Sequence, residues 1–183
     1  MTAPEWIARQ LGHTNTEMLF RVYSRYVPNL TRQDGSAMER LLASRLSSNT
    51  PQLRLESVDI LGLAAEEASR ADTELDGEPL VLLADARLMR HLLRNLLENS
   101  RRYASGTPIE VHVRSIVGGG CRICVLDRGP GIPEAEQQKV FEPFYRAIGS
   151  AETGDGVGYG LALVKRIAQL HGGDALYQPR EGG

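Results

Sequence analysis

The stretch from Arg94 to Tyr103 combines side chains that could bind a charged ligand with leucines that could bury a helix. Apolar residues recur at steps of three and four, the pattern of one buried helix face: Leu88, Met89, Leu92, Leu93, Leu96 and Leu97. The other face carries carboxamides, a carboxylate and a guanidinium: Asn95, Glu98, Asn99 and Arg102. At about 100° per residue these four side chains span roughly a quarter of a turn, so they can converge on one ligand. The alternative is an ordinary solvated helix face.

A glycine-containing loop follows a short apolar run further along the chain. Residues 123–126 read as a buried strand, and the sequence Asp127-Arg128-Gly129-Pro130-Gly131 comes directly after it. A carboxylate at such a strand end can accept a hydrogen bond from the exocyclic amine of a base.

A second glycine-rich segment, Gly154 to Gly160, runs into a helical pattern from Leu161 to Leu170. Free backbone N–H groups and the positive end of the helix dipole favour a phosphate at such a junction. Either glycine loop alone is weak evidence, because most glycine-rich turns are only turns. The order of the three features is more informative than any one of them.

In sequence order the chain presents Asn-x-x-Glu-Asn on a helix, Asp-x-Gly-x-Gly after a strand, the segment Phe141–Arg146, and Gly-x-Gly-x-Gly opening a helix. Over about residues 51–183 this order resembles the N, G1, F and G2 boxes of sensor histidine kinases, which are Bergerat-fold ATPases. The resemblance implies an α+β fold, a two-layer α/β sandwich. It also implies that the chain binds Mg-ATP and transfers the γ-phosphoryl group to a histidine of a partner domain.

The resemblance assigns the base to the first glycine box. Asp127 would read the adenine, and Gly129 and Gly131 would give the base room. Tyr103 would pack on the base or the ribose.

The resemblance assigns Mg²⁺ to Asn95 and Asn99, directly or through water, and hard oxygen ligands suit that ion. Glu98 would act as the general base that polarises the attacking imidazole. Its competing interpretation is a surface salt bridge to Arg101 or Arg102.

Arg102 and Arg146 would meet the phosphates. The cofactor-binding positions at the last box, whose glycines would line the triphosphate, are Gly156, Gly158, Gly160 and Leu161. This chain has Tyr159 where the family usually has leucine, and the larger ring could crowd the phosphates or swing to solvent.

Periodicity and turn residues predict the surrounding elements. We expect a strand over residues 53–60, a helix over 60–70, and a hairpin over 74–83 that turns at Asp76-Gly77. Asp85 is a candidate N-cap for the central helix. A clear alternation predicts a second hairpin from strands at 109–114 and 121–126, within a mostly antiparallel sheet covered by helices on one face.

A last strand is expected from Asp174 to Gln178, after a helix that ends at His171-Gly172. Sensor kinases usually have a further strand beyond this point. We therefore expect a truncated domain with an open sheet edge.

Residues 1–48 look unrelated to the domain at 49–183. The segment from Trp6 to Tyr26 resembles the C-terminal tail of phage-type tyrosine recombinases, with His13 and either Tyr23 or Tyr26 in the family's positions. Strand transfer also needs arginines from upstream segments that are not seen here. The favoured interpretation is a short helical appendage without a role on DNA.

Composition bounds the remaining possibilities. The 183 residues carry 21 Lys and Arg against 23 Asp and Glu, a net charge of −2, which argues against a general nucleic-acid surface. No apolar run is long enough to cross a bilayer, so a cytoplasmic chain is expected. Cys121 and Cys124 are interpreted as packing thiols, since residues three apart on a strand face opposite sides.

The implied partners are a histidine-bearing dimerisation domain and a response regulator. Because the helix pair with the acceptor histidine is not seen in the sequence, phosphorylation would occur in trans. Two alternatives remain open: a serine kinase like the anti-sigma factors, and a nucleotide-binding or vestigial fusion product without activity.

Overall fold

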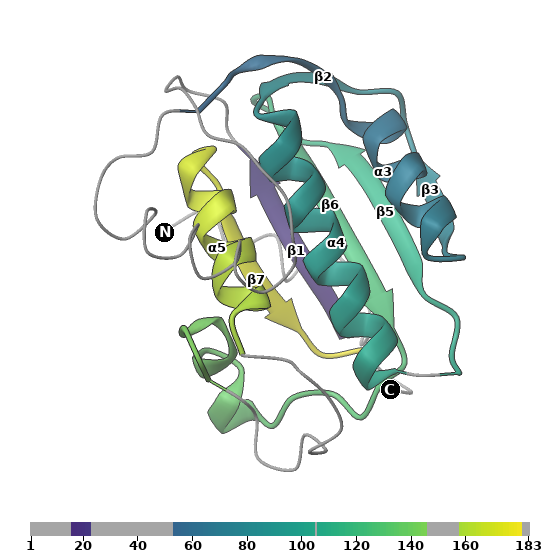
Figure 1. Cartoon of the computed structure of the whole chain (residues 1–183), viewed down its shortest axis with the longest axis vertical. Coiled ribbons are helices and arrows are strands. Elements are labelled where there is room, and N and C mark those ends of the chain that lie inside the picture. The colour runs from purple at the N-terminus through teal and green to yellow at the C-terminus, as the bar shows by residue number, and fades with distance from the viewer. Residues whose placement is uncertain (1–15, 23–52, 105, 146–157, 181–183) are drawn as a thin grey trace.

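The computed structural model describes residues 16–22, 53–104, 106–145 and 158–180. Helices α3, α4 and α5 cover one face of a five-stranded sheet with the order β3-β5-β6-β1-β7 (Figure 1). The elements are β1 (Thr16–Val22), β2 (Glu56–Asp59), α3 (Ile60–Arg70), β3 (Glu74–Gly77), β4 (Val81–Ala84), α4 (Ala86–Tyr103), β5 (Glu110–Ser115), β6 (Cys121–Asp127), α5 (Gly160–Leu170) and β7 (Asp174–Gln178), with 3-10 turns η1 (Glu134–Glu136) and η2 (Lys139–Phe141). The predicted two-layer α+β sandwich is confirmed.

Strands β5 and β6 form the antiparallel hairpin predicted from alternation, with Val111 opposite Val125. The hairpin predicted over residues 74–83 was wrong. Strand β3 runs parallel to β5, and β4 pairs instead with β2 in a separate two-stranded sheet. The chain stays in β3 through Gly77, and Pro79, two residues later, has no amide N–H to extend the ladder. The Asp-Gly pair therefore ends a strand without making a two-residue turn.

Residues 16–22 correct the expectation of a helical appendage, because they form a strand within the main sheet. Strand β1 pairs antiparallel with β6 from Thr16 to Val22 on one side and with β7 on the other. It lies beside β6 in Figure 1, although about thirty residues separate it from β2 along the chain. The missed signal is an alternation in the sequence, where Met18, Phe20 and Val22 are separated by single residues. Within the described residues β7 is an edge strand, and it reaches β6 only through β1.

The core lies between the helices and the inner face of the sheet. Met89 and Leu92 of α4, Ile167 of α5 and Ile123 of β6 are fully buried there. Cys121 belongs to this core, and burial raises the pKa of its thiol to about 12. Cys124 packs in a separate small cluster, as expected for residues that face opposite sides of a strand. Among the described residues, no helix is both long enough and apolar enough to cross a membrane.

The start of α4 is fixed by the predicted cap and by a buried histidine. The Asp85 carboxylate accepts hydrogen bonds from the N–H groups of Arg87 and Leu88, 3.1 and 3.3 Å away. The backbone N–H of Asp85 donates to Nε2 of His171 at 3.0 Å. Nδ1 of His171 must then carry the proton, and it donates to the carbonyl of Ile167 at 2.8 Å. A neutral imidazole therefore ties the first residue before α4 to the end of α5.

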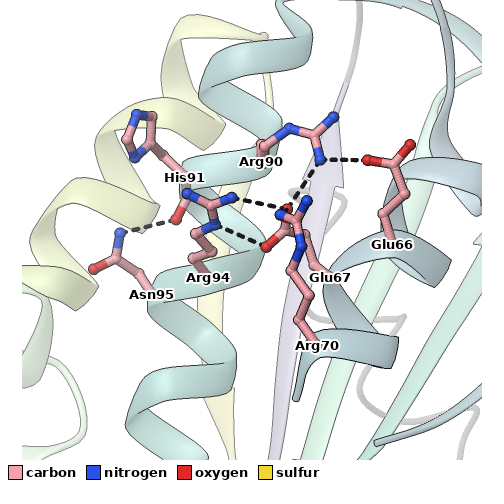
Figure 2. A network of polar contacts seen from close by, with 7 residues as sticks. All are labelled: Glu66, Glu67, Arg70, Arg90, His91, Arg94 and Asn95. Carbon is pink, nitrogen blue, oxygen red and sulfur yellow. Dashed lines mark hydrogen bonds and ion pairs between the residues drawn. The ribbon is translucent and has the colours of Figure 1, made fainter. Parts of the chain in front are cut away.

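The middle of α4 is fixed against α3 by a carboxylate surrounded by arginines (Figure 2). Glu67 of α3 is 2% exposed, and it accepts hydrogen bonds from Arg70, Arg90 and Arg94 at 2.8 to 2.9 Å. Burial alone would raise the pKa of Glu67, but the hydrogen bonds from Arg94 and Arg90 outweigh it and lower the pKa. These contacts set the rotation of α4 about its axis, because they hold two of its side chains one turn apart.

The position of β1 predicts that a proline inside it is costly. Both edges of the strand are paired, so Leu19→Pro removes a ladder hydrogen bond and should lower the free energy of unfolding by more than about 2 kcal/mol. Leu19→Val keeps the amide and should change it by less than about 1 kcal/mol. Urea unfolding followed by circular dichroism measures both. Equally small effects would mean that residue 19 is not inside the sheet.

The arginine cluster predicts different costs for two neighbouring carboxylates. Glu67→Gln removes the charge that three guanidinium groups share, and should destabilise the fold by about 2 to 4 kcal/mol. Glu66→Gln is the matched control, because the Glu66 side chain is 57% exposed and its pair with Arg90 should contribute less than about 1 kcal/mol. Equal losses in urea unfolding would contradict the role given to Glu67.

The His171 contact predicts a loss of stability on mild acidification. Burial lowers the pKa of His171 below its ordinary 6.5, so the unfolded chain binds more protons once the pH falls below that value. Stability should be level above about pH 7 and should fall between about pH 6.5 and 5. Burial and the nearby charge of Arg94 also lower the pKa of His91, so this histidine should add to the same loss of stability.

Thermal unfolding from pH 7.5 to 5 checks this expectation. His171→Gln should lower stability at pH 7.5 and make the pH dependence shallower, and a further His91→Gln change should make it shallower still. A slope that is the same in all three proteins would show that neither histidine is responsible.

Candidate functional site

The polar face of α4 divides into a buried part and an exposed part. Asn95 is 7% exposed, and its carboxamide N–H donates to the backbone carbonyl of His91 at 2.8 Å (Figure 2). Asn99 is half-buried, whereas Glu98 and Arg102 are exposed. The four side chains that share one helix face in the sequence analysis therefore differ in burial. The two asparagines face another element.

That element is the first residue of α5. A Cβ on Gly160 would lie 2.8 Å from Oδ1 of Asn95 and 3.7 Å from Nδ2 of Asn99. A side chain at position 160 would force the Asn95 carboxamide to shift away from its hydrogen bond with His91, so the close approach favours glycine there. The structure therefore brings the two asparagines of α4 to the N-terminal end of α5, where backbone N–H groups have no partner within the helix.

The carboxylate of Asp127 lies at the end of β6 and is held on both oxygens. Oδ2 accepts a hydrogen bond from the Ser100 hydroxyl at 2.8 Å, and Oδ1 accepts one from the Gly129 N–H at 3.0 Å. Ser100 is 5% exposed and directly follows Asn99 on α4. The sequence prediction missed Ser100, and the available signal was a small hydroxyl residue within an otherwise polar stretch of the helix.

The loop after Asp127 lies beside the end of α4. A Cβ on Gly129 would be 3.1 Å from the carbonyl oxygen of Tyr103, a residue that is 44% exposed. The predicted base-binding residues are therefore neighbours in space. Because Ser100 and Asn99 are adjacent on α4, the same helix contacts both the loop at Asp127 and the start of α5.

Tyr159 does not swing to solvent. It is 7% exposed within the core, and its ring lies 5.6 Å from that of Phe144, at an interplanar angle of 52°. Burial raises the pKa of Tyr159, and Arg166 partly opposes this shift. The ring pair joins the segment after η2 to the residue before α5, so the tyrosine serves packing at this junction.

The remaining predicted residues divide between described and undescribed positions. Arg146 and Gly156 lie outside the described residues, as do His13, Tyr23 and Tyr26. Gly158 has a left-handed backbone, with φ of 72°, and Leu161 is partly buried against the core. The ion pairs formed by the arginines of α4 run to Asp85, Glu66 and Glu67, so the alternative Glu98 salt bridge is not formed among the described residues.

Comparison with known proteins identifies the family of this chain. The family described as "Histidine kinase-, DNA gyrase B-, and HSP90-like ATPase" matches residues 84–183. The swarming motility regulation sensor protein RssA of Serratia marcescens is 34% identical over 154 residues, covering 78% of this chain and 32% of that protein. The chain thus spans about a third of the length of this relative.

Two solved structures resemble the fold of this chain. The mycobacterial sensor histidine kinase MprB superposes with a TM-score of 0.58 at 26% identity, covering 68% of this chain and 99% of that one. Full-length ShkA in complex with AMPPNP superposes with a TM-score of 0.59 at 25% identity, covering 78% of this chain and 37% of that one. With the family matching more than half of its length, the chain belongs to the histidine kinase-, DNA gyrase B- and HSP90-like ATPases.

Proposed function

We propose that this chain is the ATP-binding catalytic part of a two-component sensor histidine kinase. One observation carries the proposal. Helix α4 brings Asn95 and Asn99 to Gly160, and it brings Ser100 to Asp127. Two carboxamides, a fixed carboxylate and the N-terminus of α5 therefore lie at the same end of the helix layer. The relatives RssA and MprB are named as sensor proteins, and ShkA was solved with an ATP analogue.

Asp127 is the residue that would read the base. Each of its oxygens already accepts one hydrogen bond, and a carboxylate oxygen can accept a second. The exocyclic amine of adenine can therefore donate to Asp127 without displacing Ser100 or Gly129. Tyr103 is exposed beside this loop, and its ring is available to pack on the base or the ribose.

The asparagines fit a magnesium ion that arrives with the nucleotide. The Asn95 amide nitrogen donates a hydrogen bond to the His91 carbonyl, and this bond orients Oδ1 toward Gly160. Carboxamide oxygens are hard ligands, which suit Mg²⁺. The ion would neutralise phosphate charge. The N–H groups at the start of α5, at Gly160 and Leu161, would donate hydrogen bonds to phosphate oxygens, and Gly156 and Gly158 would line the triphosphate. Arg102 and Arg146 are assigned to phosphate contact.

Glu98 is the proposed general base. It is exposed on α4 next to Asn99, so a histidine on another domain can reach it. In the transfer step an imidazole nitrogen attacks the γ-phosphorus, the bond to the bridging β,γ-oxygen breaks, and ADP leaves. Glu98 polarises the imidazole N–H, whose proton is released as phosphohistidine forms. Positioning and charge stabilisation should contribute more to the rate than this proton transfer.

This function implies two partners in the cytoplasm, a histidine-bearing dimerisation domain and a response regulator. In this proposal residues 16–22 contribute a strand to the sheet, and no recombination on DNA is assigned to residues 1–48.

A phosphoserine product would favour the serine-kinase alternative. Acid treatment separates phosphoserine from phosphohistidine, because phosphohistidine is acid-labile.

Replacement of Asn99 tests the nucleotide site. Asn99→Ala removes a proposed magnesium ligand, and we expect calorimetry to show loss of Mg-ATP binding. An affinity equal to that of the wild-type chain would refute the role of Asn99.

Glu98→Gln is the matched control on the same helix. This variant should bind Mg-ATP like the wild-type chain, and transfer of radiolabelled phosphate to a separately supplied histidine-bearing helix domain should fall by about 10²-fold or more. Loss of binding together with transfer would place Glu98 in the nucleotide site and remove it as the general base.

A further inference from the structure

The loop that follows β6 has little secondary structure to hold it. Between Asp127 and Ile132 the chain contains two glycines and Pro130, and Pro133 follows directly. Neither proline can donate a backbone hydrogen bond, and glycine leaves the backbone free to take many conformations. A loop of this composition needs anchors from outside if it is to present a base-binding carboxylate in one geometry.

One anchor, at the start of the loop, is the pair of hydrogen bonds that Asp127 makes with Ser100 and Gly129. The other is at its far end. The backbone N–H of Ile132 donates to the hydroxyl oxygen of Tyr177 at 3.0 Å, and the carbonyl of Ile132 accepts from Nε2 of Gln137 at 3.1 Å. Both backbone polar groups of Ile132 are thus satisfied by side chains.

Tyr177 reaches the loop from β7, which is not adjacent to β6. Strand β1 lies between them, so Tyr177 is two strand spacings, roughly 10 Å, from the end of β6 in the direction across the sheet. The ring packs against the core and the hydroxyl meets the loop. At Gly131, where φ is 72°, a Cβ would lie 3.3 Å from that hydroxyl, so the backbone passes directly beside it.

We infer that Tyr177 is a positioning residue for the nucleotide site, acting on the loop that carries Asp127, Gly129 and Gly131. This inference rests on the proposed function and deepens it. With the hydroxyl in place the loop is fixed at both ends before a ligand arrives, and binding need not order it. Without the hydroxyl, the far end of the loop loses a backbone partner, and part of the binding free energy goes into ordering the loop.

Tyr177→Phe tests the inference, because it keeps the ring that packs on the core and removes only the hydrogen bond. Hydrogen exchange at the Ile132 amide in the nucleotide-free chain should become about fivefold faster or more. Calorimetric affinity for Mg-ADP should weaken by about three- to tenfold. Exchange at the core amide of Val125 should stay as in the wild-type chain, which separates loop loosening from general destabilisation.

Tyr145→Phe is the matched control, since it removes a hydroxyl that bonds to Glu136 and not to the loop. It should leave the Ile132 exchange unchanged. Unchanged Ile132 exchange in Tyr177→Phe would overturn the inference, as would faster exchange with unaltered affinity. If the wild-type chain bound no Mg-ADP, the proposed function would fail, while the Ile132 exchange would still decide whether Tyr177 holds the loop.

Discussion

The hydrogen bond between the Ser100 hydroxyl and the Asp127 carboxylate joins the two halves of the candidate site. Ser100 belongs to the helix that carries Asn95 and Asn99, and Asp127 begins the glycine loop after β6. The 2.8 Å contact fixes the end of α4 against the sheet with a buried polar group that is satisfied. Everything proposed for the nucleotide depends on this alignment, because the base and the phosphates of one ligand must be met by both elements at once.

Helix α4 is held along its length by contacts of different kinds. Its start is capped by Asp85 and tied to His171, its middle is clamped through Glu67, and its buried asparagine abuts the first residue of α5. Its apolar face packs on the sheet throughout. A helix held in this way cannot rotate or slide without breaking several buried polar contacts, so the spacing of its side chains is transferred directly to the site.

Local patterns in the sequence predicted the elements whose signals are local. The apolar periodicity of α4, the cap at Asp85 and the β5–β6 hairpin all depend on residues within one turn or one strand pair. Strand β1 and the parallel pairing of β3 with β5 depend on distant partners, and no short window reveals which strand a segment will join. The order of the four boxes, which resembles that of a known family, predicted the fold even though these strand pairings were not predicted.

The candidate site shows the same division. Asn95, Asn99 and Asp127 were predicted from residue type and order, and the structure brings their elements together. Ser100 and Tyr177 were not predicted, since each acts through a hydrogen bond to a residue at least 27 positions away. The sequence left open whether Tyr159 crowds the phosphates or swings to solvent, and its packing was not predicted, because its surroundings come from Phe144 on another segment.

The proposed nucleotide site is tested most directly by titrating the purified chain with Mg-AMPPNP and following the amide chemical shifts. We expect saturable, magnesium-dependent binding of one nucleotide, with the largest shift changes at the amides of Gly129 and Gly160. Absence of saturable binding, or binding that leaves both amides unperturbed, would contradict it.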